Sequence, residues 1–171
     1  MRIAVIGIGQ SLRGDDAVGL EAVRQWQENY PETANRSDIQ VDVSELPGLA
    51  LLDLLDGSEA AILVDAVKCY SVPGTIHTLR SEQLSAFTTD AKSAHGWGVA
   101  ETLRLDRMLN PNRQTIPIQI IGVEVGQMQV GNGLSKTVEQ ALPRICEAIQ
   151  NEVQALLAIQ PDGIIRWIPF P

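Results

Sequence analysis

Two carboxylates and one imidazole, Asp16, Asp65 and His95, are the side chains of this sequence best suited to hold a divalent cation. Carboxylate oxygen and imidazole nitrogen suit zinc or a similar borderline metal, and three ligands leave coordination positions open for water or substrate. The three residues are far apart in the chain and form no compact motif such as H-E-x-x-H. A metal site at these residues therefore depends on a fold that brings them together.

Asp16 follows what reads as the first half of a βαβ unit. The β-branched, apolar run that opens at Ile3 predicts a strand buried on both faces. Glycines 7, 9 and 14 then indicate a turn, and apolar residues at helical spacing run from Gly19 to Tyr30. Asp16 is thus expected at the carboxyl end of the first strand, where open α/β sheets carry their sites.

The glycine turn resembles a phosphate-binding loop only in part. Gly7 and Gly9 fit the dinucleotide fingerprint, but Leu12 occupies its third glycine position and no G-K-[ST] follows. An acidic pair at the helix N-terminus would also repel an anion. We therefore expect no nucleotide site here. Asp15 is expected to cap the helix, and Asp16 either lies in its first turn or contributes to the crevice.

The remaining pattern predicts one three-layer α/β/α domain over residues 1–171, with a mostly parallel, doubly wound sheet and one antiparallel edge strand. In the strand order 2-1-3-4-5, the first and third strands are neighbours. Asp65 follows the third expected strand, so topology would place it in the same crevice as Asp16. The further strands are expected at residues 39–43, 60–64, 75–79 and 115–125, with the strand at 75–79 at an edge of the sheet. The further helices are expected at 49–55, 81–86, 99–110 and 134–156.

The two histidines and two cysteines differ in context. His77 lies in an alternating strand and is expected to be a half-exposed strand residue, whereas His95 lies at a loop-to-helix junction among small residues. Cys146 falls on the apolar stripe of the last helix, which predicts a core residue. Cys69 and Cys146 form no C-x-x-C motif, a usage that suits a reducing cytoplasm and argues against a disulfide framework or a zinc ribbon.

Composition excludes several classes of partner. The chain has 171 residues, 44% of them hydrophobic, and a net charge of −8 with scattered basic residues. We therefore expect no nucleic-acid or anionic-membrane partner. No apolar run reaches the length of a membrane span, and no signal peptide is recognisable, so a cytoplasmic location is expected. The apolar tail at about 158–171 is expected to cover part of the sheet or to dock to a partner.

Several short motifs together resemble the hydrogenase maturation endopeptidases, the proteases that trim the C-terminus of the large subunit of nickel–iron hydrogenases. Their order and spacing are more specific than any one of them, and the resemblance runs from Ile3 to about Leu157. The motifs are Gly7-x-Gly9-x-x-x-x-Gly14-Asp15-Asp16-x-x-Gly19, Val64-Asp65-Ala66, Pro73-Gly74-Thr75, Ser93-x-His95 and Gly133-Leu134-Ser135-x-x-Val138.

The resemblance implies a function. The metal-binding and catalytic residues of the family fall on Asp16, Asp65 and His95. Nickel already installed in the large-subunit precursor is implied to guide the protease, and zinc or cadmium could occupy the site in vitro. A cation held there would polarise the scissile carbonyl. This chain has Gln10 where the family usually has asparagine, and a different turn at residues 44–48; both turns are expected to contact the substrate.

Two other classes remain as alternatives. One is a non-cleaving maturation module that binds the immature subunit; the presence of all three site residues, Asp16, Asp65 and His95, favours an enzyme over it. The other is a flavodoxin-like nucleotide or flavin binder. The acidic pair at the phosphate position argues against it.

Overall fold

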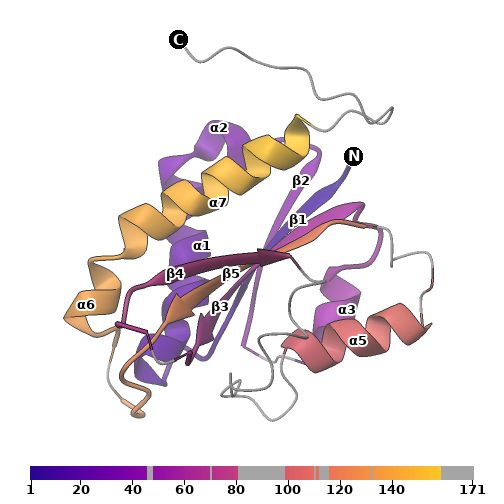
Figure 1. The fold of residues 1–171 in the computed structure, drawn as a ribbon. Coiled ribbons are helices and arrows are strands. Elements are labelled where there is room, and N and C mark those ends of the chain that lie inside the picture. The colour runs from indigo at the N-terminus through magenta and orange to yellow at the C-terminus, as the bar shows by residue number, and fades with distance from the viewer. Residues whose placement is uncertain are drawn as a thin grey trace.

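The computed structural model describes residues 1–45, 48–69, 71–80, 99–109, 111, 116–131 and 133–158. Five strands form one sheet in the order β2-β1-β3-β5-β4 (Figure 1). The pairs β1–β2, β1–β3 and β3–β5 are parallel, and β4–β5 is antiparallel. The strands are β1 (Ile3–Ile8), β2 (Ile39–Ser44), β3 (Ala60–Val67), β4 (Ile76–Arg80) and β5 (Ile118–Glu124). The predicted α/β class with one antiparallel edge strand is confirmed.

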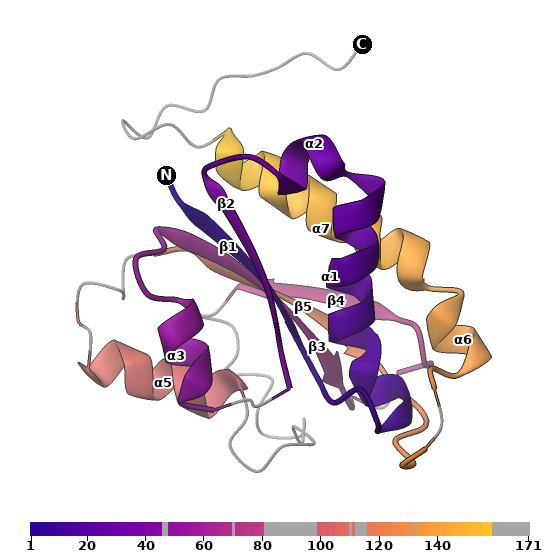
Figure 2. The ribbon, with the colours of Figure 1, turned by 180° about the vertical axis from the view of Figure 1, so that it is seen from behind.

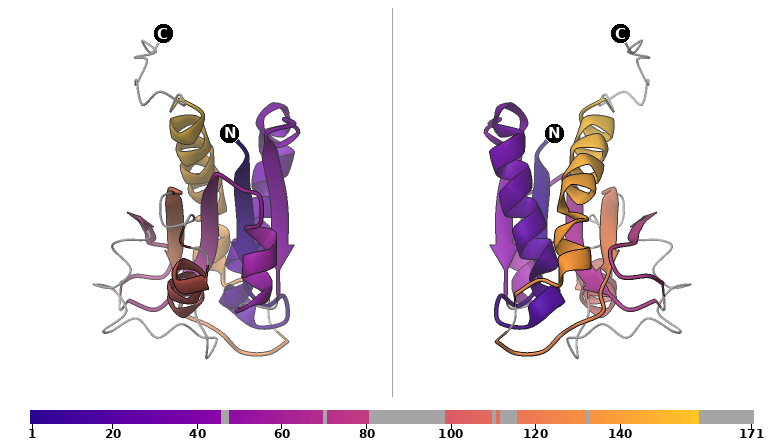
Figure 3. Two further views of the ribbon diagram at one scale, coloured as in Figure 1. Left: turned by 90° about the vertical axis from the view of Figure 1, so that its right-hand side faces the viewer. Right: turned by 90° about the vertical axis from the view of Figure 1, so that its left-hand side faces the viewer.

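Helices cover both faces of the sheet and make three layers (Figures 2 and 3). One face carries α1, α2, α6 and α7, and the other carries α3 and α5. A 3-10 turn, η1, precedes α1. Their bounds are η1 (Gly14–Ala17), α1 (Val18–Asn29), α2 (Pro31–Ala34), α3 (Ala50–Leu54), α5 (Val99–Leu109), α6 (Lys136–Glu139) and α7 (Leu142–Leu157).

Each face of the sheet has its own apolar core. Alternate residues of β1 point to opposite faces, so Val5 packs toward α1 and α7 while Ile6 packs toward α3 and α5. All six residues of β1 are buried, as expected for a strand covered on both sides. Cys146 is 1% exposed within the α1–α7 layer, which confirms it as a core residue.

The strand expected at an edge, residues 75–79, is the edge strand β4, whereas the order of the last two strands is the reverse of that in 2-1-3-4-5. β5 lies between β3 and β4, although β4 precedes it in the chain. Hydrophobicity explains this exchange. β5 is buried at six of its seven positions, whereas no position of β4 is fully buried, so the more apolar strand takes the interior place.

The predicted last helix is divided into α6 and α7. The division falls immediately before Pro143, which lies in the first turn of α7. Proline lacks a backbone N–H, so it is tolerated where a helix begins and breaks one that would continue through it. The expected helix at 81–86, His95 and the tail from residue 159 onward lie outside the described residues. Within the described part of the chain, none of the helices combines the length and apolarity of a membrane span.

Candidate active site

Two glycines bring the start of the first helix onto the sheet. A Cβ atom at Gly9 would lie 2.0 Å from the backbone oxygen of Asp16, so only glycine lets the loop pack against η1. A Cβ atom at Gly19 would lie 2.2 Å from the oxygen of Ile8 and 2.3 Å from that of Val64. Close backbone contact therefore holds η1 against the carboxyl ends of β1 and β3.

The two carboxylates predicted for the site are both buried. Asp16 is 0% exposed in η1, and Asp65 is 6% exposed in β3. The two elements contact each other, as the position of β1 beside β3 requires. One oxygen of Asp65 accepts a hydrogen bond of 2.8 Å from the backbone N–H of Ala66. The structure thus brings the elements carrying Asp16 and Asp65 together, and the role of His95 stays a prediction.

Asp15 has a different role from the expected helix cap. Its Oδ2 accepts hydrogen bonds from the backbone N–H groups of Gly126 at 3.2 Å and Gln127 at 2.9 Å, and its Oδ1 accepts one from Ser135 at 2.5 Å. Its own N–H donates to the oxygen of Gln127 at 2.8 Å. Asp15 therefore fastens the β5–α6 connection to the glycine turn. The prediction of a cap was wrong because local spacing cannot reveal partners so far along the chain.

The glycine turn after β1 and the first residues after β2 lie side by side. The N–H of Gly9 donates to the oxygen of Ser44 at 3.2 Å, and the Ser11 hydroxyl lies 3.0 Å from Oε2 of Glu45. Both turns follow strands that end at the same edge of the sheet as β3. They therefore lie beside the crevice in which Asp16 and Asp65 were predicted to meet.

A second group of possible ligands was not predicted from the sequence. The ligand atoms of Cys69, His77 and Glu124 all lie within 4.8 Å of one another. His77 Nε2 lies 3.4 Å from Glu124 Oε2, and both carboxylate oxygens of Glu124 accept the backbone N–H of Cys69, at 2.9 and 3.0 Å. The sequence feature that could have pointed to this group was Glu124, a carboxylate at the end of an apolar strand. His77 is of intermediate exposure, as predicted, with its side chain 19% accessible.

The second group lies on the same sheet face as Asp65 but apart from it. Asp65 pairs with Gly122 of β5, and Gly122 pairs with His77 of β4. Residues in one such row point to the same face, and two strand spacings separate the Cα atoms of Asp65 and His77 by about 10 Å. The Val67 side chain covers the place left by Gly122. The two groups of polar side chains therefore lie on one face of the sheet, about two strand spacings apart.

Neither cysteine has the environment of a nucleophile. Burial, and then the neighbouring Glu124 carboxylate, raise the pKa of the Cys69 thiol. Burial raises the pKa of Cys146 to about 11. Reactive cysteines have lowered pKa values that favour the thiolate. In the protein without a bound cation, both thiols are therefore protonated at neutral pH.

Comparison with known proteins identifies the kind of protein and its family. A hydrogenase maturation protease family model matches residues 39–152. The chain is 29% identical over 169 residues to the hydrogenase 2 maturation protease of Escherichia coli K12, covering 96% of this chain and 94% of that protein. It is 31% identical over 118 residues to the hydrogenase expression/formation protein HupD of Rhodobacter capsulatus, covering 67% and 55%.

Solved structures agree with the sequence matches. The solution structure of an endopeptidase from Escherichia coli superposes with a TM-score of 0.78 at 25% identity, covering 91% of this chain and 94% of that one. The fold and these matches define the protein as an endopeptidase, and so as a hydrolase. The chain belongs to the hydrogenase maturation protease family.

Proposed function

We propose that this protein removes the C-terminal extension of the large-subunit precursor of a nickel–iron hydrogenase, and that Asp16, Asp65 and His95 form its site. Two findings support the proposal: the chain belongs to the hydrogenase maturation protease family, and two buried aspartates lie on contacting elements at one edge of the sheet. The burial of this pair is the observation that carries it.

Buried carboxylates fit the binding of a cation. Desolvation and mutual repulsion both disfavour two ionised carboxylates in one crevice, and a divalent cation offsets both costs. Two carboxylates and an imidazole are oxygen and nitrogen donors that suit nickel and zinc. In this proposal the nickel is carried by the precursor and is part of the substrate. A cation held by these residues polarises the scissile carbonyl and makes water more acidic.

The protein's own side chains hold the substrate and move the proton. Hydrolysis of one peptide bond consumes one water: its oxygen bonds to the carbonyl carbon, the C–N bond breaks, and a proton reaches the departing amine. A carboxylate that is not engaged with the cation accepts a proton from this water as general base and returns it to the amine. Asp15 keeps η1 in place against the β5–α6 connection during these steps.

Intact-mass measurement on two forms of the precursor tests the proposal. The protein is incubated with the nickel-loaded and the nickel-free large subunit of its own organism. The expected result is loss of a short C-terminal peptide from the nickel-loaded form, with little processing of the nickel-free form. Equal processing of both forms would contradict the proposal that nickel guides the protease. Binding without any change of mass would support the non-cleaving module instead.

A matched pair of variants separates the chemistry from the fold. Asp65→Asn keeps the shape of the side chain but removes its charge, so processing is expected to stop. Asp53→Asn makes the same change at an exposed position of α3 and is expected to process at the normal rate. An active Asp65→Asn protein would contradict the assignment of the site.

A further inference from the structure

We propose that Cys69, His77 and Glu124 form a second metal site, which binds a zinc-class divalent cation independently of the predicted Asp16, Asp65 and His95 site. Among the described residues, these side chains offer a thiol sulfur, an imidazole nitrogen and a carboxylate oxygen within 4.8 Å of one another. The inference rests on this geometry and does not depend on the proposed substrate.

The distances match those of a tetrahedral zinc site. Zinc binds sulfur at about 2.3 Å and nitrogen or oxygen at about 2.0–2.2 Å, so tetrahedral ligand atoms lie about 3.3–3.7 Å apart. The separation of His77 Nε2 from Glu124 Oε2 is 3.4 Å, within that range. All three ligand atoms lie within 4.8 Å of one another. A small movement of the side chains would therefore bring them to the distances of a bound zinc ion.

Hydrogen bonds fix the carboxylate in place before any cation arrives. Both oxygens of Glu124 accept the Cys69 N–H. The backbone oxygen of Glu124 accepts the N–H of Gly74 at 2.8 Å, and its own N–H donates to Thr75 at 2.9 Å. A carboxylate has about four lone-pair positions, so Glu124 can keep these bonds and also bind a cation.

Cys69 and His77 are the more accessible members of the group. The Glu124 side chain is 3% exposed, so its charge is poorly solvated, whereas His77 is 19% exposed and Cys69 is intermediate. A cation entering past His77 and Cys69 would offset the buried charge and keep a fourth position for water. The thiol selects zinc-class metals over magnesium and calcium, which prefer oxygen ligands alone.

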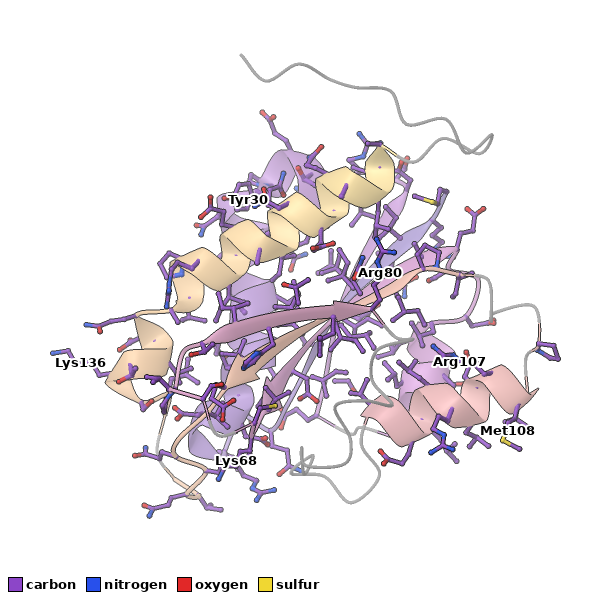
Figure 4. All side chains as sticks on the ribbon, in the orientation of Figure 1. Tyr30, Lys68, Arg80, Arg107, Met108 and Lys136 are labelled. Atoms are coloured by element: carbon purple, nitrogen blue, oxygen red, sulfur yellow. The ribbon has the colours of Figure 1, made fainter. Side chains whose placement is uncertain are left out.

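The three ligands come from three separate segments. Cys69 lies in the connection after β3, His77 lies in β4, and Glu124 ends β5. In Figure 4, Lys68, next to Cys69, lies near the carboxyl ends of β3 and β5, whereas Arg80 lies toward the other end of the sheet. A bound cation would therefore fasten the edge strand and its connection to β5, and is expected to raise the melting temperature.

Cobalt titration of the full chain tests the site. One equivalent of Co²⁺ is expected to produce a thiolate-to-cobalt charge-transfer absorption. Cys69→Ser should remove this absorption, while Cys146→Ala, at the buried second cysteine, should keep it. His77→Gln should weaken cobalt binding by more than the roughly 10–100-fold that loss of an outer hydrogen-bond partner costs. The absorption should persist in Asp65→Asn. A failure of the proposed active site can therefore be told apart from a failure of the second metal site.

Alkylation of the unaltered protein gives a second measurement that needs no variant. One equivalent of Zn²⁺ should slow the modification of Cys69 by iodoacetamide, as located by peptide mass spectrometry, and leave Cys146 unaffected. An absent thiolate absorption, or alkylation of Cys69 at the same rate with and without zinc, would overturn the site. A thiolate absorption that depends on Cys146 would overturn it as well.

Discussion

The Asp15 carboxylate accepts a hydrogen bond of 2.5 Å from the backbone N–H of Ser135, a residue 120 positions further along the chain. The same side chain also accepts the N–H groups of Gly126 and Gln127. Asp15 is 0% exposed, so these three donors replace the water that an ionised carboxylate would otherwise bind. One side chain of the glycine turn thereby positions the connection between β5 and α6.

Replacing Asp15 is expected to destabilise the whole domain. In Asp15→Asn the amide group turns an NH₂ toward backbone N–H donors and loses the charge-assisted bonds, at a cost of about 3 kcal/mol in the free energy of unfolding. Urea denaturation measures this difference. The exposed Asp53→Asn change should stay within about 0.5 kcal/mol of the unaltered protein. Full stability combined with lost processing would instead give Asp15 a direct part in the reaction.

Loss of any predicted site residue should stop processing without unfolding the protein. We expect Asp16→Asn, Asp65→Asn and His95→Ala each to lower the rate of precursor cleavage by at least about 100-fold, since each removes a charge or donor that the chemistry needs. Circular dichroism and intact mass are measured on the same samples. A folded and active His95→Ala protein would show that the imidazole of the site is a different one.

The close approach at Gly9 predicts a large effect from one added methyl group. Gly9→Ala would place a carbon 2.0 Å from the Asp16 oxygen, so η1 must move, and stability should fall by about 2 kcal/mol or more together with cleavage. Gly133→Ala is the control, because a Cβ atom there meets nothing within 4 Å. Thermal unfolding and processing rates compare the two. An equal effect of both changes would contradict the close packing of the turn.

The stability contributed by Cys146 should depend on pH. Its folded pKa of about 11 lies above the ordinary value of 9.0, so the contribution is fully present below pH 9 and is lost as the pH rises through 11. A rise of this size corresponds to about 2–3 kcal/mol at 1.36 kcal/mol per pH unit. The difference in unfolding free energy between the unaltered protein and Cys146→Ala should shrink over this range. A constant difference would contradict the raised pKa.

The fold followed from the sequence where local signals were strong. The apolar runs of β1 and β3 and the glycine turn predicted a parallel sheet, and the neighbouring strands place β3, which carries Asp65, in contact with η1, which carries Asp16. The partners of Asp15 were missed because they lie far along the chain, whereas the break before Pro143 is a local effect of proline that the continuous apolar stripe of the last helix did not show. The order of β4 and β5 was not predicted because it depends on how apolar each strand is relative to the other. The more apolar strand takes the interior place, and this comparison needs the whole sheet.

The Cys69, His77 and Glu124 group depends on a strand register that the sequence pattern alone does not reveal. Cys69 and His77 lie eight residues apart, and Glu124 lies much further along the chain. The order 2-1-3-4-5 already makes the strands that carry His77 and Glu124 neighbours, but it does not fix their register. Their approach follows from β5 lying beside β4 in antiparallel register, with His77 opposite Gly122. A strand histidine and a strand-end glutamate are ordinary residues until that register is known.

The place of β4 at the edge also bears on how the chain can fold as it is made. Among the described strands β4 pairs only with β5, yet it leaves the ribosome before β5 does. Until residues 118–124 emerge, β4 has no strand to pair with, while β1, β2 and β3 can already assemble. An unpaired strand edge is where nascent chains aggregate. The polar and half-exposed side chains of β4 protect the chain during that interval.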